Sequence, residues 1–169
     1  MDASYCYEWN DLTLSPRDPY DEEVARRRHA DGKLYTALLG EPTAPYALVE
    51  VRLETPWVGV HFLDDKLRRQ VLYSFGSPEK GMLFLEKYRR IEFDQDGSKS
   101  SSETVKFRKD GRLEVSDLDC STNIVETCSI DADVSGNWEA PPALGDYTSI
   151  ARFERELLPR PSGRGRLLG

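Results

Sequence analysis

Apolar and polar residues alternate most clearly in three short runs in the first half of the chain. These runs are Ala47–Glu54, Trp57–Leu63 and Arg68–Phe75, separated by Pro56 and by the polar turn Asp64-Asp65-Lys66. A period of two is typical of antiparallel strands that bury one face. We therefore expect the core to lie on one side of this meander. The expected core residues are Val49, Val51, Leu53, Val58, Val60, Phe62, Val71, Tyr73 and Phe75.

Shorter runs on both sides of the meander extend the expected sheet. They are Tyr5–Trp9, Lys33–Leu39, Thr104–Arg108, Arg112–Val115 and Ile124–Ile130. The Asp110-Gly111 pair between two of these runs predicts a hairpin with a type I′ turn. Met82–Phe93 fits a helix at its start, but Ile91 and Phe93 fit only a strand, so we favour a strand from Leu85 onward.

Two peripheral helices are expected as well. Asp18 followed by Pro19 and three acids is typical of a helix start, and Asp31-Gly32 would end that helix. Asp146 would cap the second helix, Tyr147–Leu158. The pattern as a whole predicts an α+β fold, an antiparallel sheet of about six to nine strands with two peripheral helices. It leaves open whether the sheet curls or closes into a barrel.

Composition and charge narrow the expected domain organisation and ligands. A chain of 169 residues with 38% hydrophobic and 31% charged residues fits one domain, expected at residues 1–159. Residues 160–169 are rich in turn-forming residues and basic, which predicts a disordered tail. The net charge of −7, less the three positive charges of that tail, leaves −10 on the body. Such a body repels nucleic acid and attracts a basic protein.

The start of the chain and its cysteines bear on the compartment. No basic region followed by an apolar run is present at the N-terminus, and no apolar stretch reaches the roughly 20 residues that span a bilayer. The three cysteines, Cys6, Cys120 and Cys128, show no disulfide framework. We expect a cytoplasmic protein with free thiols and no membrane partner.

Motifs for catalysis or metal binding are absent from the sequence, so we expect no enzyme activity, cofactor or metal. The cysteines and the two histidines lack the paired spacing of a zinc site. Asp131–Asn137 resembles the start of a calcium loop, but Pro142 stands where the bidentate Glu should be. His61 remains a candidate general base or ligand if its side of the strand is covered. A structural histidine is the other interpretation.

The segment between positions 117 and 139 combines carboxylates with one large aromatic side chain, Trp138. An aromatic anchor framed by charges is typical of a protein interface. The predicted partner-binding residues are Asp117, Asp119, Glu126, Asp131, Asp133, Trp138 and Glu139. The alternative is a solvated acidic loop whose Trp138 folds back onto the core.

Several of these pieces occur together in an order that resembles a known class of proteins. They are Phe62-Leu63-Asp64, Leu72-Tyr73-Ser74-Phe75, Met82-Leu83-Phe84-Leu85-Glu86, Phe107-Arg108-Lys109-Asp110-Gly111, Asn137-Trp138-Glu139 and Gly145-Asp146-Tyr147. This order, over residues 34–158, resembles the small β-rich immunity proteins of bacterial polymorphic toxin systems. The resemblance implies a cytosolic inhibitor that binds one toxin domain and performs no chemistry.

The leading functional expectation is therefore a non-enzymatic immunity protein that neutralises a toxin domain with a basic surface. The alternative is a small-ligand-binding or hydrolase-like β-barrel with a cavity lined by Trp57, His61 and Tyr73. A structural subunit of a larger assembly is a third possibility.

Overall fold

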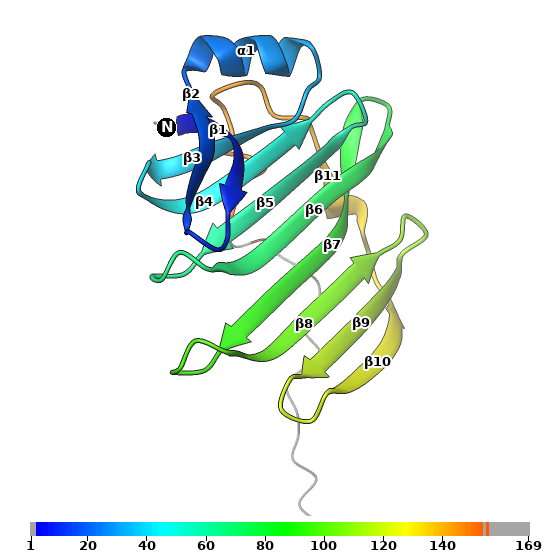
Figure 1. The fold of residues 1–169 in the computed structure, drawn as a ribbon. Coiled ribbons are helices and arrows are strands. Elements are labelled where there is room, and N and C mark those ends of the chain that lie inside the picture. The colour runs from blue at the N-terminus through cyan, green and yellow to red at the C-terminus, as the bar shows by residue number, and fades with distance from the viewer. Residues whose placement is uncertain (1–2, 154, 156–169) are drawn as a thin grey trace, which may run out of the picture.

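The strands of the protein form one large antiparallel sheet, seen in a computed structural model that describes residues 3–153 and 155 (Figure 1). Eleven strands belong to this sheet. They are β1 (Ala3–Asn10), β2 (Ser15–Tyr20), β3 (Tyr35–Glu41), β4 (Ala44–Arg52), β5 (Trp57–Leu63), β6 (Arg69–Glu79), β7 (Met82–Phe93), β8 (Lys99–Phe107), β9 (Arg112–Asp119), β10 (Ile124–Asp131) and β11 (Trp138–Glu139). The antiparallel architecture is confirmed, but six to nine strands was too low.

The sheet is open, with β10 at one edge and β2 at the other. Its order is β10-β9-β8-β7-β6-β5-β4-β3-β1-β2, and the short β11 pairs with the beginning of β7. The sheet therefore does not close into a barrel, a question that the sequence left open. The sequence pattern missed β2 because its residues, Ser-Pro-Arg-Asp-Pro-Tyr, do not alternate, and it missed β11 because two residues carry no period.

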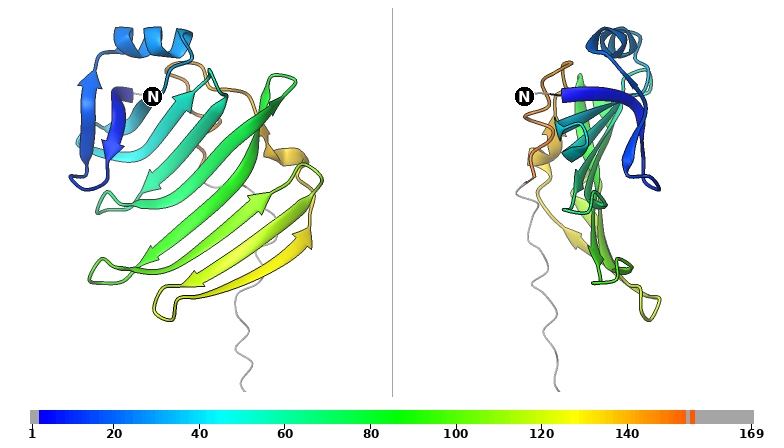
Figure 2. Two further views of the ribbon diagram at one scale, coloured as in Figure 1. Left: turned by 45° about the vertical axis from the view of Figure 1, so that its right-hand side comes forward. Right: turned by 60° about the vertical axis from the view of Figure 1, so that its left-hand side comes forward.

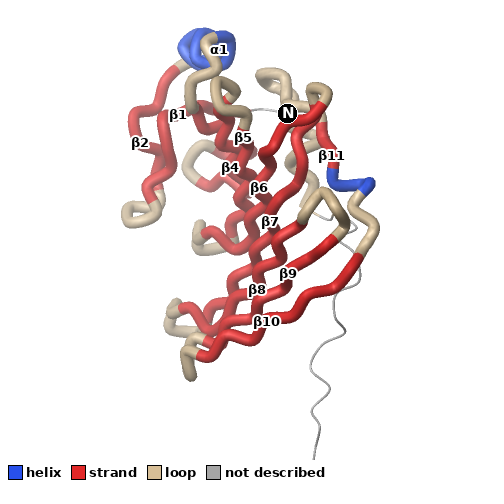
Figure 3. Tube along the Cα trace, turned by 90° about the vertical axis from the view of Figure 1, so that its right-hand side faces the viewer, coloured by secondary structure: helices blue, strands red, loops and turns tan. Residues whose placement is uncertain are grey.

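The described residues contain one α-helix, α1 (Glu22–Ala30), and a single turn of 3-10 helix, η1 (Ser135–Asn137) (Figure 3). The predicted start at Asp18 is wrong, because Asp18 lies in β2 with a φ of 47°. Asp21 is the N-cap instead, and its side chain accepts a hydrogen bond of 2.9 Å from the Val24 N–H. The acids Glu22 and Glu23 then occupy the first turn, where the helix dipole favours them.

The predicted second helix, Tyr147–Leu158, is wrong over the residues that the structure describes. Residues 147–153 are turns and coil, and residues 154 and 156–169, including the predicted tail, lie outside the described part. One helical hydrogen bond forms, from the Ala151 N–H to the Tyr147 carbonyl at 2.8 Å. Tyr147 and Ile150 are nevertheless fully buried against the sheet. A short segment gains more from such packing than from marginal helix formation.

Residues 140–153 form a strap that crosses one face of the sheet, which we call the strap face. In the edge-on view of Figure 2 the strap (orange) lies on one side of the sheet, and the β1–β2 hairpin bends toward the other side, the open face. The expected core is confirmed on the strap face. Eight of its nine residues are buried there, and Leu53 packs against them half-buried.

Two local predictions concern the second half of the sheet. The hairpin between β8 and β9 is confirmed, but its turn type is wrong. Only Gly111 has a positive φ, 88°, and its N–H bonds to the Arg108 carbonyl at 3.0 Å. The Arg108 N–H in turn bonds to the Arg112 carbonyl at 2.9 Å, so three residues, 109–111, connect this pair, with glycine in the left-handed position. Met82–Phe93 is a strand throughout, which confirms the part from Leu85 onward.

Candidate functional site

Three of the predicted partner-binding residues meet on the strap face, beyond the strap. The strand register places Asp117 directly between Glu103 on β8 and Glu126 on β10, with Asp119 two residues along β9. Asp117 and Glu126 are exposed and make no hydrogen bond or ion pair within the described residues. Like charges directly opposite one another destabilise a sheet. We call Glu103, Asp117, Asp119 and Glu126 the acidic row. Asp119 also orders the turn after β9, where its carboxylate accepts hydrogen bonds from the Ser121 N–H at 2.9 Å and from Ser121 Oγ at 2.6 Å.

The acidic row ends at β10, an edge strand with little protection against pairing. Seven of its eight residues are exposed, including Ile124 (56%) and Val125 (59%). It contains no proline, lysine or arginine, the residues that usually blunt an edge.

The opposite edge, β2, shows the usual protections. It carries Pro16, Arg17 and Pro19, and the left-handed backbone of Asp18 interrupts its regularity. Prolines cannot donate the hydrogen bonds that a new strand needs. The two edges of the same sheet therefore differ in their capacity to accept another strand.

The remaining predicted residues do not join the acidic row. Asp131, at the end of β10, lies opposite Arg112, and its side alternates away from that of Glu126. Asp133 accepts a hydrogen bond of 2.8 Å from the Ser135 N–H, and this bond lowers the pKa of its exposed carboxyl.

Trp138 folds back onto the sheet, as the alternative interpretation of the acidic segment expects. Its ring lies 4.9 Å from that of Phe84, and the Lys109 ammonium lies 5.2 Å from its centre. The indole is half-buried, so it is engaged within the protein and is not a free anchor.

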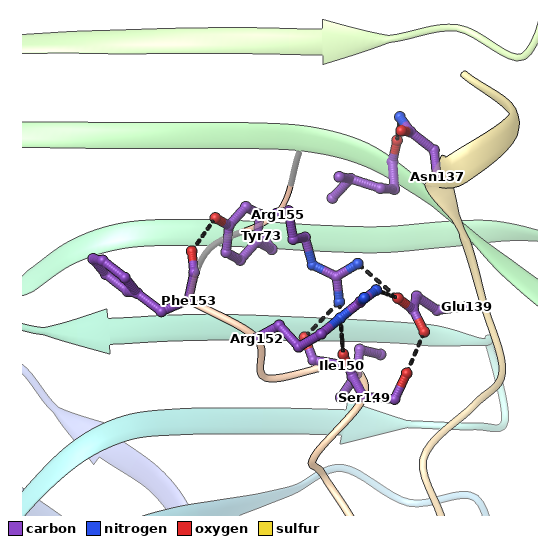
Figure 4. Close-up of polar contacts among 9 residues, drawn as sticks. Tyr73, Asn137, Glu139, Ser149, Ile150, Arg152, Phe153 and Arg155 are labelled. Carbon is purple, nitrogen blue, oxygen red and sulfur yellow. Dashed lines mark hydrogen bonds and ion pairs between the residues drawn. The ribbon is translucent and has the colours of Figure 1, made fainter. Parts of the chain in front are cut away.

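Glu139 is buried, and it ties the strap to the sheet (Figure 4). Its carboxylate accepts hydrogen bonds from Ser149 Oγ at 2.6 Å and Arg155 Nη1 at 2.7 Å, and it also pairs with Arg152. Burial raises the pKa of this carboxyl, but the hydrogen bonds and the two guanidinium charges outweigh burial and hold it below the usual 4.5. Glu139 therefore stabilises the fold and is not exposed to a partner.

His61, the other candidate, belongs to a charged cluster on the open face. Arg69 Nη1 lies 2.8 Å from His61 Nε2 and 3.0 Å from a Glu50 oxygen, and Arg69 Nε donates to Asp11 at 2.9 Å. Burial raises the pKa of Glu50, but His61 and Arg69 together hold it below its usual range. This cluster fixes Arg69 and offers no nucleophile.

The expected cavity lined by Trp57, His61 and Tyr73 is also wrong. Tyr73 belongs to the core of the strap face, where its hydroxyl donates to the Phe153 carbonyl at 2.8 Å. Trp57 and His61 lie on the open face, where the indole packs over Gly59 and donates to Ser74 Oγ at 2.9 Å. The sheet separates the two groups.

The open face also carries a cationic groove that the sequence did not predict. Arg68, Arg69, Arg89 and Lys99 line a groove of about 350 Å³ beneath the β1–β2 turn. These residues come from three separate stretches of the chain, and only the strand register brings the stretches together. The sequence did show that Lys87, Arg89 and Ile91 share one side of β7. It did not show which residues of the neighbouring strands face them.

The chain was compared with protein-family models, with curated proteins and with solved structures. No family model, curated protein or solved structure matches the chain. Among the described residues, no helix is long and apolar enough to cross a membrane, and no group of three or more His, Cys, Asp or Glu side chains is arranged to hold a metal ion.

Proposed function

We propose that this protein is a non-enzymatic binding protein that captures a basic protein partner along the β10 edge. The observation that carries the proposal is the unprotected edge strand beside the acidic row. An extended segment that pairs with such an edge gains main-chain hydrogen bonds, and the alternate side chains decide its specificity. The partner segment would carry lysine or arginine at alternate positions, facing Glu126 and Asp117.

The charge of the protein supports a different protein as the occupant over a second copy. Two copies pairing through β10 would bring two acidic rows together on chains that each carry a net charge of −7. That repulsion opposes a homodimer, whereas a basic partner would neutralise the row and associate faster.

The biological role that we propose is a cytosolic immunity protein that neutralises a cognate toxin domain. The order of sequence elements that resembles immunity proteins supports this role, and so does an exposed acidic edge suited to a basic domain. Neutralisation would require only that the bound edge strand cover a surface the toxin needs.

The test begins with the product of the gene next to that of this protein. Binding is measured by surface plasmon resonance at two salt concentrations, alongside a synthetic peptide with lysine at alternate positions. We expect Glu126→Lys to slow association, because steering charges act over a Debye length of about 8 Å at physiological ionic strength. Glu41→Lys on β3, an exposed acid distant from β10 in the sheet order, is the matched control and should leave association nearly unchanged.

Strand addition itself is tested with proline on β10. Adjacent residues of a strand point their N–H groups in opposite directions, so one of Thr127→Pro and Cys128→Pro removes an outward donor and keeps the pairing with β9. The variant with native thermal stability should lose affinity by about tenfold or more. Binding that ignores both the proline and Glu126→Lys would place the interface elsewhere.

A further inference from the structure

The groove on the open face has the size and lining of a small-molecule site. Its volume of about 350 Å³ lies within the range of roughly 300–1,000 Å³ typical of ligand pockets. Leu14, Leu72, Ile91 and Phe93 supply apolar surface, and the polar lining is predominantly cationic. Among the described residues that line it, Asp11 carries the one carboxylate.

Two of the four cations in the groove are already neutralised. Arg68 donates to Asp64 at 2.8 Å, and its guanidinium stacks 3.9 Å from the centre of the Phe93 ring. Arg69 is held by Asp11 and by the Glu50–His61 pair. These side chains are fixed in place and form the walls of the groove.

Arg89 and Lys99 have no such compensation. Neither makes a hydrogen bond or an ion pair within the described residues, and Arg89 Nε is buried without a partner. The register places Leu72 and Thr104 on either side of Arg89, so no carboxylate faces it from β6 or β8. A buried guanidinium nitrogen without an acceptor is costly, and a bound anion would remove that cost.

Arg90, the next residue on β7, shows the contrast. It points to the strap face, lies opposite Glu103 and has Glu92 within 3.8 Å. The chain therefore compensates one arginine of this pair and leaves the other facing an apolar groove.

We propose that this groove binds a small amphipathic carboxylate. The planar guanidinium of Arg89 matches a carboxylate in two parallel hydrogen bonds, and Lys99 supplies a second positive charge at the rim. The apolar body of the ligand would lie against Leu72 and Ile91. This site lies on the open face, whereas the acidic row lies on the strap face, so it does not depend on the proposed partner.

The test uses benzoate as the probe, with acetate and inorganic phosphate as comparison anions. Titration followed by two-dimensional amide NMR should show saturable shifts at the groove, with benzoate binding more tightly than acetate or phosphate. Arg89→Gln should weaken benzoate binding about tenfold or more, because a charge-assisted hydrogen-bonding group is lost. Arg90→Gln removes the same charge from the same strand and should change affinity less than about twofold.

Lys99→Ala changes an exposed residue and should leave the fold intact. It should also weaken benzoate binding, and it replaces Arg89→Gln as the test if that variant does not fold. An equal loss in Arg89→Gln and Arg90→Gln would show a non-specific charge effect and overturn the proposal. Equal affinity for benzoate, acetate and phosphate would remove the role of the apolar lining and also overturn it. Shifts that do not saturate would mean that the groove is no site at all.

Discussion

Two carboxylates of this protein, Glu50 and Glu139, belong to ion pairs that their protonation would break. Glu139 is buried and Glu50 is partly buried, and both have a pKa below the usual 4.5. Their stabilising contribution is therefore complete above about pH 5 and is lost as pH falls through the lowered pKa values.

We predict that Glu139→Gln lowers the free energy of unfolding at pH 7 by about 3 kcal/mol, because Arg155 would remain buried without its counter-charge. The variant should also lose stability less steeply than the wild type between pH 5 and pH 3.5, since it no longer has this carboxyl to protonate. Urea unfolding at several pH values measures both effects, and Glu41→Gln should change neither. A variant with wild-type stability and the same pH slope would show that the pair does not hold the strap.

The side chain of Phe62 packs between the sheet and the strap, so its removal tests the packing of the strap face. Its ring makes edge contacts with Tyr73 at 5.9 Å and with Phe153 of the strap at 5.1 Å, and it is 4% exposed. Phe62→Ala should lower the free energy of unfolding by about 3–5 kcal/mol in chemical denaturation. A loss below about 1 kcal/mol would contradict the assigned register of β5.

Individual elements differed in how well the sequence predicted them, and the difference has a physical cause. The meander β4–β6 was predictable because one face is buried, which forces alternation. β2 and β11 were not, because edge position and backbone pairing hold them without an apolar pattern. The strap looked helical because residues 147, 150 and 151 have helical spacing, but that spacing does not say what the residues pack against.

The candidate sites were predictable to a similar degree. The sequence placed Asp117, Asp119 and Glu126 in one acidic stretch, but the expected strand Arg112–Val115 ended before Asp117. Their meeting depends on the extension of β9 to Asp119 and on its register with β10, which the pattern did not show. Glu139 lies in the same acidic stretch, but its role depends on Arg155, which only the folded strap brings near. Arg89 was missed because its lack of an acidic neighbour is a property of the register.

The helix α1 offers a separate test of a single element. Asp21 caps it, and Ala25 is its one fully buried residue, so the cap carries much of its local stability. Asp21→Ala should lower the free energy of unfolding by about 1 kcal/mol. Amide hydrogen exchange should show faster exchange at Val24 and in the first turn, with little change on β7–β10. Uniformly faster exchange would mean that the helix unfolds only together with the sheet.

At the level of the whole molecule, an open sheet with one unprotected edge is at risk of pairing with itself. β2 is blocked by prolines, so self-association through the edges depends on β10 alone. The strand lacks lysine and proline, and the acidic row beside it is the remaining barrier. We therefore infer that charge, and not backbone geometry, keeps β10 available for a partner.

This inference makes a prediction about the oligomeric state at neutral pH. The wild type should sediment as a monomer at low salt, and Asp117→Asn with Glu126→Gln should self-associate at lower concentrations, because removing two like charges from each copy weakens the repulsion. Adding whichever of Thr127→Pro and Cys128→Pro preserves stability should return that variant to a monomer, since the edge then lacks a donor. Replacing Glu22 and Glu23 by glutamine changes the net charge equally and should leave the wild-type behaviour intact. A wild type that is already dimeric at low salt would instead make β10 an interface between copies, and the proposed basic partner would lose its surface.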